Sequence, residues 1–204
     1  MAIRGALRSL PNLLTLLRIA LIPLVLWLVW LGTPRASFWG AMVYALSAIT
    51  DFVDGWLARR WGEVSLLGAF LDPLADKLLV MALLVLLVDL GRAPAWAVIV
   101  ILARELAVTS LRAIAMSQGL SLAARASGKE KTAVQMVALL MLIVHFPYDV
   151  RFGFATVRAD FHLVGLALLY VAVLLSVVSG ADYVRHVLVA ARSGPERGPT
   201  DGAG

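Results

Sequence analysis

Long apolar runs separated by short polar breaks dominate the pattern along this chain. The breaks contain turn-forming or charged residues, such as Gly32-Thr33-Pro34 and Gly91-Arg92-Ala93-Pro94. Most runs approach the roughly 20 residues that a helix needs to cross a membrane. The pattern therefore predicts an all-α membrane protein, a bundle of six transmembrane helices at about residues 13–31, 37–57, 66–90, 95–116, 133–146 and 161–189.

The two ends of the chain differ from this bundle. Residues 1–10 hold Arg4 and Arg8 among apolar residues, which favours a short amphipathic helix on an anionic membrane surface. The Gly- and Pro-rich residues 193–204 are polar and are expected to be disordered. We therefore expect one membrane domain over residues 1–192, with a polar connection at 117–132 and no internal repeat.

Composition supports a membrane protein and excludes several functions. Of the 204 residues 61% are hydrophobic and 15% are charged, and the mean hydropathy is +0.90, which is too apolar for a soluble domain. Cysteine is absent, so disulfides and thiolate metal sites are excluded. The net charge of +5 fits membrane orientation and lipid headgroups, and no basic-aromatic interleaving indicates nucleic-acid binding.

The distribution of basic residues orients the predicted bundle. The N-terminus, the 59–65 loop, the 117–132 connection and the C-terminus fall on one side of a six-span fold, and most Lys and Arg lie on or near that side. Cytoplasmic segments of membrane proteins carry such an excess. Both termini are therefore expected in the cytoplasm.

Four aspartates lie on or beside apolar helices, where an unpaired charge is costly. Asp51 and Asp54 are three residues apart and Asp72 and Asp76 are four apart, so each pair occupies one face of its helix. A short loop makes the two helices antiparallel neighbours, so the two faces can meet. Carboxylates without His or Cys favour Mg²⁺ or Mn²⁺, which commonly serve phosphates.

Two other interpretations of these acids remain open from the residues alone. The acids could pair with Arg59, Arg60 and Lys77 as buried salt bridges, although ionisable groups inside a membrane usually mark function. A cation transporter could also use them. Their clustering at the cytoplasmic side, with arginines nearby, favours phosphate over a cation path.

The same stretch resembles a known family signature. It fits D-x2-D-G-x2-A-R-x8-G-x3-D-x3-D without a mismatch, which resembles the signature of the CDP-alcohol phosphatidyltransferases. The likeness continues in PNLLTLLR at 11–18, ARE at 103–105, LR at 111–112 and GKEKTAVQ at 128–135, and these segments are most similar to bacterial phosphatidylglycerophosphate synthases. Only the tail from 193 falls outside it.

The resemblance implies an enzyme of the bacterial inner membrane, with its active site facing the cytoplasm. It would transfer the phosphatidyl group of CDP-diacylglycerol to sn-glycerol 3-phosphate, with Mg²⁺ or Mn²⁺ and release of CMP. Asp51, Asp54 and Asp72 match metal-ligand positions, and Asp76 matches the general base and also a metal position. Family members are commonly homodimers.

The substrate-binding residues follow from the same likeness and from spacing. Positions that border the cytidine diphosphate in the family are matched by Gly55, Ala58, Arg59 and Gly68. Asn12, Thr15 and Arg18 are three apart, so one face can point toward the acids and the lipid donor; helix capping and snorkelling are the alternatives. Candidates for the acceptor's phosphate are Arg104, Arg112, Lys129 and Lys131, with Glu105 placed to orient Arg104.

Other activities of the same or another class remain alternatives. A sister enzyme could use phosphatidylglycerol (a cardiolipin synthase), serine or inositol phosphate as acceptor, and the basic residues favour a phosphorylated one. A lipid-binding protein without activity is disfavoured by the intact acids. Metal-dependent CMP release would separate these enzymes from a transporter.

The remaining polar residues are assigned no catalytic role. His145, His162 and His186 are isolated from one another in sequence, and Asp149, Arg151, Arg158 and Asp160 are expected in a solvated loop. Lys77 points away from Asp76 and is expected to snorkel or to pair elsewhere. Pro73 either begins a helix that Asp72 caps or interrupts a longer one.

Overall fold

The computed structural model of the chain describes residues 10–61, 66–117, 127–152 and 155–193. Within these ranges, the side chains of 10–15, 51–73, 76, 127–131, 150–152, 155–157 and 190–193 are outside the description. The predicted N-terminal amphipathic helix and most of the C-terminal tail also lie outside the described residues.

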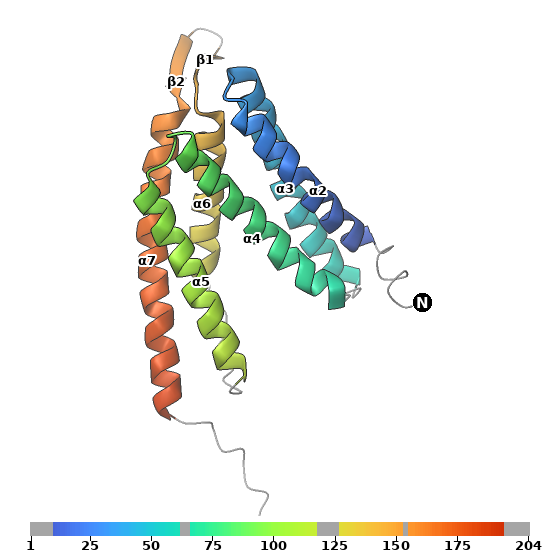
Figure 1. The fold of residues 1–204 in the computed structure, drawn as a ribbon, viewed down its shortest axis with the longest axis vertical. Helices are drawn as coiled ribbons and strands as arrows, with labels where there is room; N and C mark the ends of the chain where they lie inside the picture. Colours follow the sequence, from blue (N-terminus) through green and yellow to red (C-terminus); the bar gives the residue numbers. More distant parts are fainter. Residues whose placement is uncertain (1–9, 62–65, 118–126, 153–154, 194–204) are drawn as a thin grey trace, which may run out of the picture.

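The described chain is almost entirely helical, as the apolar pattern predicts (Figure 1). Most helices begin and end within four residues of the expected spans. The helices are α2 (Leu10–Trp30), α3 (Pro34–Trp61), α4 (Leu66–Asp89), α5 (Ala95–Ser117), α6 (Ser127–Val144) and α7 (Phe161–Ser193). Helix α6 begins six residues earlier than expected, at Ser127, so the last part of the expected polar connection is helical.

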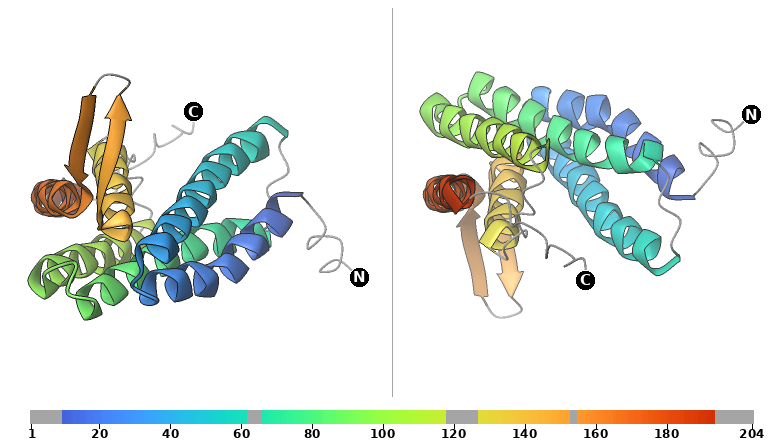
Figure 2. Two further views of the ribbon diagram at one scale, coloured as in Figure 1. Left: turned by 90° about the horizontal axis from the view of Figure 1, so that it is seen from above. Right: turned by 90° about the horizontal axis from the view of Figure 1, so that it is seen from below.

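The helices converge at one end of the molecule and diverge at the other. Figures 1 and 2 show α2, α3 and α4 splaying away from α5, α6 and α7 toward the end where α3 finishes and α4 begins. Helix α2 packs against α3 and α4, while α6 packs against both α7 and α3. The fully buried side chains of the core include Leu83, Leu87, Ile101, Leu139 and Leu169.

Helices α6 and α7 approach most closely at Gly165. A Cβ atom at this position would lie 2.9 Å from the backbone nitrogen of Leu142 and 2.9 Å from two atoms of its side chain. No larger residue fits without moving one helix, so glycine allows this close contact.

The segment expected to be a solvated loop is a β-hairpin, so that expectation is wrong. Strands β1 (Pro147–Phe152) and β2 (Ala155–Asp160) pair antiparallel, with Asp149 opposite Arg158. The Tyr148 hydroxyl donates a hydrogen bond to the Pro34 carbonyl oxygen at 3.0 Å, which ties the hairpin to α3. At the end of β2, Asp160 caps α7 by accepting from the Leu163 N–H at 3.1 Å.

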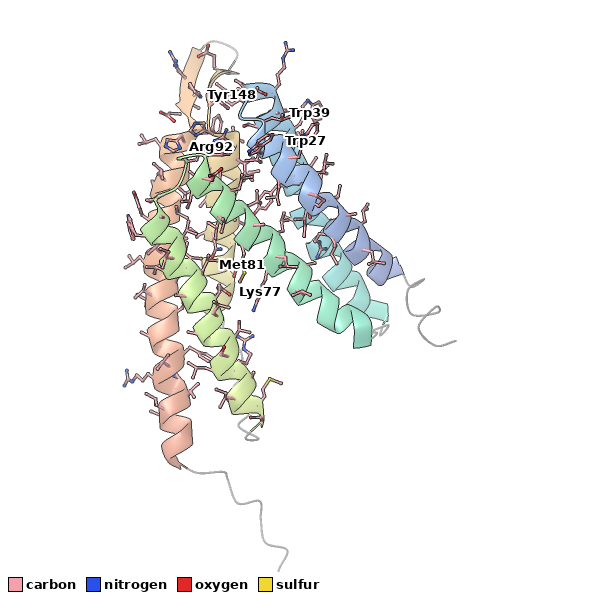
Figure 3. The ribbon with its side chains drawn as sticks, viewed as in Figure 1. Trp27, Trp39, Lys77, Met81, Arg92 and Tyr148 are labelled. Atoms are coloured by element: carbon pink, nitrogen blue, oxygen red, sulfur yellow. The ribbon has the colours of Figure 1, made fainter. Side chains whose placement is uncertain are left out.

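Arg92 joins three parts of the bundle beneath this hairpin (Figure 3). Its side chain is buried in the turn between α4 and α5, and its Nη1 donates to Ser37 Oγ at 3.2 Å and to the Ile143 carbonyl oxygen at 3.1 Å. The guanidinium also lies 5.5 Å from the centre of the Phe146 ring. One cation thus connects the start of α3, the α4–α5 turn and the end of α6.

Replacing this cation should destabilise the fold. Arg92→Met leaves the Ser37 hydroxyl and the Ile143 carbonyl without their donor, so we expect the free energy of unfolding to fall by about 2–4 kcal/mol. Thermal unfolding of the detergent-solubilised protein measures the change. Arg35→Met, at an exposed arginine of the same end, should leave the midpoint nearly unchanged. Equal effects of both substitutions would contradict a specific role of Arg92.

His145 and His162 are in contact, although the sequence analysis treated them as isolated. Their Nδ1 atoms are 3.1 Å apart, so one ring donates and the other accepts. His145 has a φ of 58°, in the left-handed region. Burial, with smaller contributions from Arg92 and His162, lowers the pKa of His145 to about 4, and Asp160 partly opposes the shift.

This lowered pKa predicts a loss of stability in mild acid. Between about pH 6.5 and pH 4 the unfolded chain binds a proton at His145 that the folded chain excludes, so stability is complete above that window and declines as pH falls through it. His145→Asn, which tolerates the left-handed backbone, should reduce the drop in melting temperature between pH 7.5 and pH 5. The exposed His186→Asn serves as control, and an equal drop in both variants would refute the prediction.

One helical stretch meets the length and hydropathy criteria for a membrane span among the described residues, Phe161–Val189 in α7. Leu16–Trp30 and Thr132–Val144 are shorter apolar stretches.

Candidate functional site

The eight signature residues lie on α3 and α4, and both helices continue through them. Asp51, Asp54, Gly55, Ala58 and Arg59 belong to α3, and Gly68, Asp72 and Asp76 belong to α4. Because α4 begins at Leu66, Pro73 lies inside it, and Asp72 is not its N-cap. The helical spacing assumed from the sequence is therefore confirmed for the backbone. The side chains of these eight residues are outside the description.

The candidate residues lie at different depths below the hairpin end of the bundle. The start of α3, the end of α4, the start of α5 and the end of α6 meet near the hairpin (Figure 1). At about 1.5 Å per residue, the predicted acids and the candidate cations Arg18, Arg104, Arg112, Lys129 and Lys131 lie roughly 14–30 Å along their helices from that end. Toward the far end α2, α3 and α4 splay away from α5, α6 and α7 (Figures 1 and 2), so a single site formed by the acids and these cations stays a prediction.

The two sides of α4 have different surroundings. On one side a groove of about 740 Å³ is lined by α2 and α4 residues that include Trp27, Trp30, Leu78, Val85 and Asp89. A helix turns about 100° per residue, so most α4 positions of this groove lie on a different helical face from positions 72 and 76. The groove is therefore separate from the acid-bearing face.

Lys77 pairs away from the acids, as expected. Its Nζ donates to Thr109 Oγ1 on α5 at 2.7 Å (Figure 3). This bond ties the acid-bearing α4 to the helix that carries Arg104 and Arg112.

Arg104 is held between α5 and α7. Its Nη1 donates to Glu105 Oε1 at 3.0 Å, which confirms the predicted pairing of the two side chains, and its Nη2 donates to Ser179 Oγ at 3.0 Å. The side chain is 16% exposed, and its buried Nε has no hydrogen-bond partner in the part of the chain that the structure describes. Each Nη atom carries a second N–H group, which gives the guanidinium donor capacity for a ligand.

The other candidate cations differ in what the structure describes. Arg112 is exposed, with its guanidinium carbon 6.0 Å from the centre of the Tyr183 ring. Arg18 is buried at 3% exposure, so it does not reach outward to lipid headgroups. Lys129 and Lys131 lie in the first turns of α6 and Asn12 and Thr15 in α2, but their side chains are outside the description.

Sequence reasoning missed the polar residues of α7 at this site. Ser179 contacts Arg104, Tyr183 contacts Arg112, and Gly180 lies against the Arg104 side chain. The signal that could have found them is the sequence SGADY at 179–183, a polar interruption in an otherwise apolar helix.

The donor chemistry of the acids fits a hard divalent cation. Among the side chains that the structure describes, no three His, Asp or Glu residues gather as metal ligands. The side chains of the four signature aspartates, Asp51, Asp54, Asp72 and Asp76, lie outside that set, and carboxylate oxygens are the ligand type that Mg²⁺ and Mn²⁺ prefer.

Comparison with known proteins gives one consistent family. The model of the CDP-alcohol phosphatidyltransferase family matches residues 8–178. The CDP-diacylglycerol–glycerol-3-phosphate 3-phosphatidyltransferase of Bacillus subtilis is 42% identical over 189 residues, covering 86% of this chain and 93% of the relative. Proteins of the same name from Rickettsia bellii and Shigella flexneri are 35% and 36% identical, covering 87% and 86% of this chain and 94% and 93% of their own.

Proposed function

This chain belongs to the CDP-alcohol phosphatidyltransferase family, and we propose that it transfers the phosphatidyl group of CDP-diacylglycerol to sn-glycerol 3-phosphate. The products are phosphatidylglycerophosphate and CMP. The observation that carries this proposal is the complete eight-residue signature, which lies on two consecutive helices. The relatives that match most of the chain bear the name of this activity.

The acids divide into metal ligands and a base. Asp51, Asp54 and Asp72 would hold Mg²⁺ or Mn²⁺, and Asp76 would act as general base with a possible further contact to metal. A bound divalent cation neutralises the diphosphate and stabilises the leaving CMP. Asp76 takes the proton of the acceptor's free primary hydroxyl, whose oxygen bonds to the phosphatidyl phosphorus as the bond from phosphorus to the CMP oxygen breaks.

The two substrates would meet the remaining candidates on either side of the acids. Arg59 and the small residues Gly55, Ala58 and Gly68 border the cytidine diphosphate, with Asn12, Thr15 and Arg18 on α2 toward the lipid donor. The buried position of Arg18 supports an inward role for it. The acceptor's phosphate would bind Arg104 and Arg112 on α5 and Lys129 and Lys131 on α6.

The membrane arrangement is part of the same proposal. Six spans, with both termini and the acids on the cytoplasmic side of a bacterial inner membrane, would place the site within reach of soluble glycerol 3-phosphate. Trp27, Trp30, Trp39 and Trp96 support one interface, because all four are more than half exposed and lie near the hairpin end of their helices. Residues 1–192 would form one domain that assembles as a homodimer, and residues 193–204 would form a disordered tail.

The acceptor distinguishes this function from those of sister enzymes. In the test, purified protein is incubated with CDP-diacylglycerol, Mg²⁺ or Mn²⁺, and one acceptor per reaction: glycerol 3-phosphate, phosphatidylglycerol, serine, inositol or inositol phosphate. CMP release and mass spectrometry of the lipid product report the reaction. We expect product only with glycerol 3-phosphate. Product with another alcohol would assign a sister activity, and ion flux in liposomes without CMP release would support a transporter.

A further inference from the structure

The interface between α5 and α7 continues from Arg104 away from the hairpin end of the bundle. At Arg104 the two helices are close: a Cβ atom at Gly180 would lie 3.0 Å from Arg104 Cγ, and Ser179 accepts the Arg104 hydrogen bond. Two turns further along α5, and one turn further along α7, Arg112 meets Tyr183. The two arginines therefore lie along one interface, each with its own contact on α7.

The Arg112–Tyr183 contact differs from the contact at Arg104. Arg104 donates two hydrogen bonds, whereas among the described residues the Arg112 guanidinium has one recorded contact, its position over the Tyr183 ring at 6.0 Å. A ring face holds a guanidinium without using its N–H groups. Arg112 is thus held in place while its donors stay available for a phosphate.

The hydroxyl group of Tyr183 does not explain why position 183 is a tyrosine. The oxygen is buried and has no hydrogen-bond partner among the described residues. A buried phenol without a partner costs free energy relative to phenylalanine, so stability alone does not favour tyrosine over phenylalanine here. The ring of Tyr183 contacts the guanidinium of Arg112.

We propose that Tyr183 is a positioning residue of the acceptor site, and that its ring holds the Arg112 guanidinium ready for the phosphate of the acceptor alcohol. This inference rests on the proposed function, because it takes glycerol 3-phosphate as the acceptor. A long arginine side chain loses rotamer freedom when it binds a ligand, and a ring that already restrains it reduces that loss. The smaller entropy loss strengthens binding of the acceptor and does not change binding of the lipid donor.

Steady-state kinetics of Tyr183 variants test the proposal. Arg112 is exposed, so its contact with the ring has the modest strength of a cation–π contact in water, and Tyr183→Leu should raise the KM for glycerol 3-phosphate about twofold to fivefold. The KM for CDP-diacylglycerol and the kcat should change less than twofold. Tyr183→Phe keeps the ring and should restore the KM for glycerol 3-phosphate. Should Tyr183→Leu fail to fold, Tyr183→Met replaces it.

Two comparisons separate positioning from packing. Tyr170→Leu removes a tyrosine at the other end of α7, stacked on Trp96, and should leave the KM for glycerol 3-phosphate unchanged. In an Arg112→Gln background, Tyr183→Leu should have no further effect on that KM, because the group that it positions is gone.

The outcomes also separate this inference from the proposed function. A wild-type enzyme that uses no glycerol 3-phosphate overturns both. An active wild type with an unchanged Tyr183→Leu variant overturns only the positioning role. The same follows if Tyr183→Phe is as impaired as Tyr183→Leu, if both substrates are affected equally, or if the effect persists in Arg112→Gln.

Discussion

Asp76→Asn should reduce kcat by about 10²- to 10⁴-fold, the usual contribution of a general base. The amide keeps the size of the side chain but cannot accept the proton of the acceptor hydroxyl. Binding of CDP-diacylglycerol and metal should remain close to wild type, since the other three acids are intact. CMP release and equilibrium binding of the lipid donor measure the two properties separately.

Asp89→Asn provides the matched control for this substitution. Asp89 is an exposed acid of the same helix and lines the groove on a different helical face from positions 72 and 76. The same change of charge there should leave kcat within about twofold of wild type, as surface substitutions usually do. Turnover of Asp76→Asn at the wild-type rate would remove Asp76 as the base, whatever the control shows.

Removal of divalent metal should abolish turnover. Without the cation the diphosphate charge is not neutralised and CMP is a poorer leaving group, so chelation should lower CMP release more than 100-fold, and Mg²⁺ or Mn²⁺ should restore it. Asp51→Asn should raise the metal concentration needed for half-maximal activity at least tenfold, whereas Asp89→Asn should not. Undiminished CMP release from chelator-treated, metal-free protein would contradict a metal-dependent site.

Helices were the most predictable part of the fold. Each apolar run from 13 to 189 corresponds to a helix, because a run of this length has one structure that satisfies its backbone in an apolar medium. The sequence also indicated that Lys77 pairs elsewhere and that Glu105 orients Arg104, and both side chains have such contacts. The partner of Lys77, Thr109, is 32 residues away and was not predicted, because only the packing of α4 against α5 brings the two together.

The hairpin was missed although its pattern is present. Tyr148, Asp149, Val150, Arg151 and Phe152 alternate apolar and charged side chains, a pattern typical of a strand, and the next residue in the sequence is a glycine. The charged residues indicated a solvent-exposed loop, but a strand at the end of a bundle also exposes charged side chains to solvent. The pairing of Pro147 with Asp160 then brings His145 near His162, so the histidine contact depends on a register that spacing alone does not reveal.

The α7 side of the candidate site required tertiary structure. Ser179 and Tyr183 are 75 and 71 residues from their partners Arg104 and Arg112, and nothing local links the two helices. The acids are predicted from local sequence alone, by their spacing within two consecutive helices, and their site stays a prediction. The sequence therefore indicates the acids and cations, and the fold adds the residues that hold two of those cations.

The central claim is that α3 and α4 together form one metal-dependent transferase site. The most direct test is to locate the bound metal. The measurement is anomalous X-ray diffraction at the manganese edge from crystals of the full chain grown with Mn²⁺ and CDP-diacylglycerol. We expect manganese coordinated by carboxylates of both helices, Asp51, Asp54 and Asp72, with the diphosphate of the donor beside it. Manganese and diphosphate bound together away from these aspartates would contradict the claim.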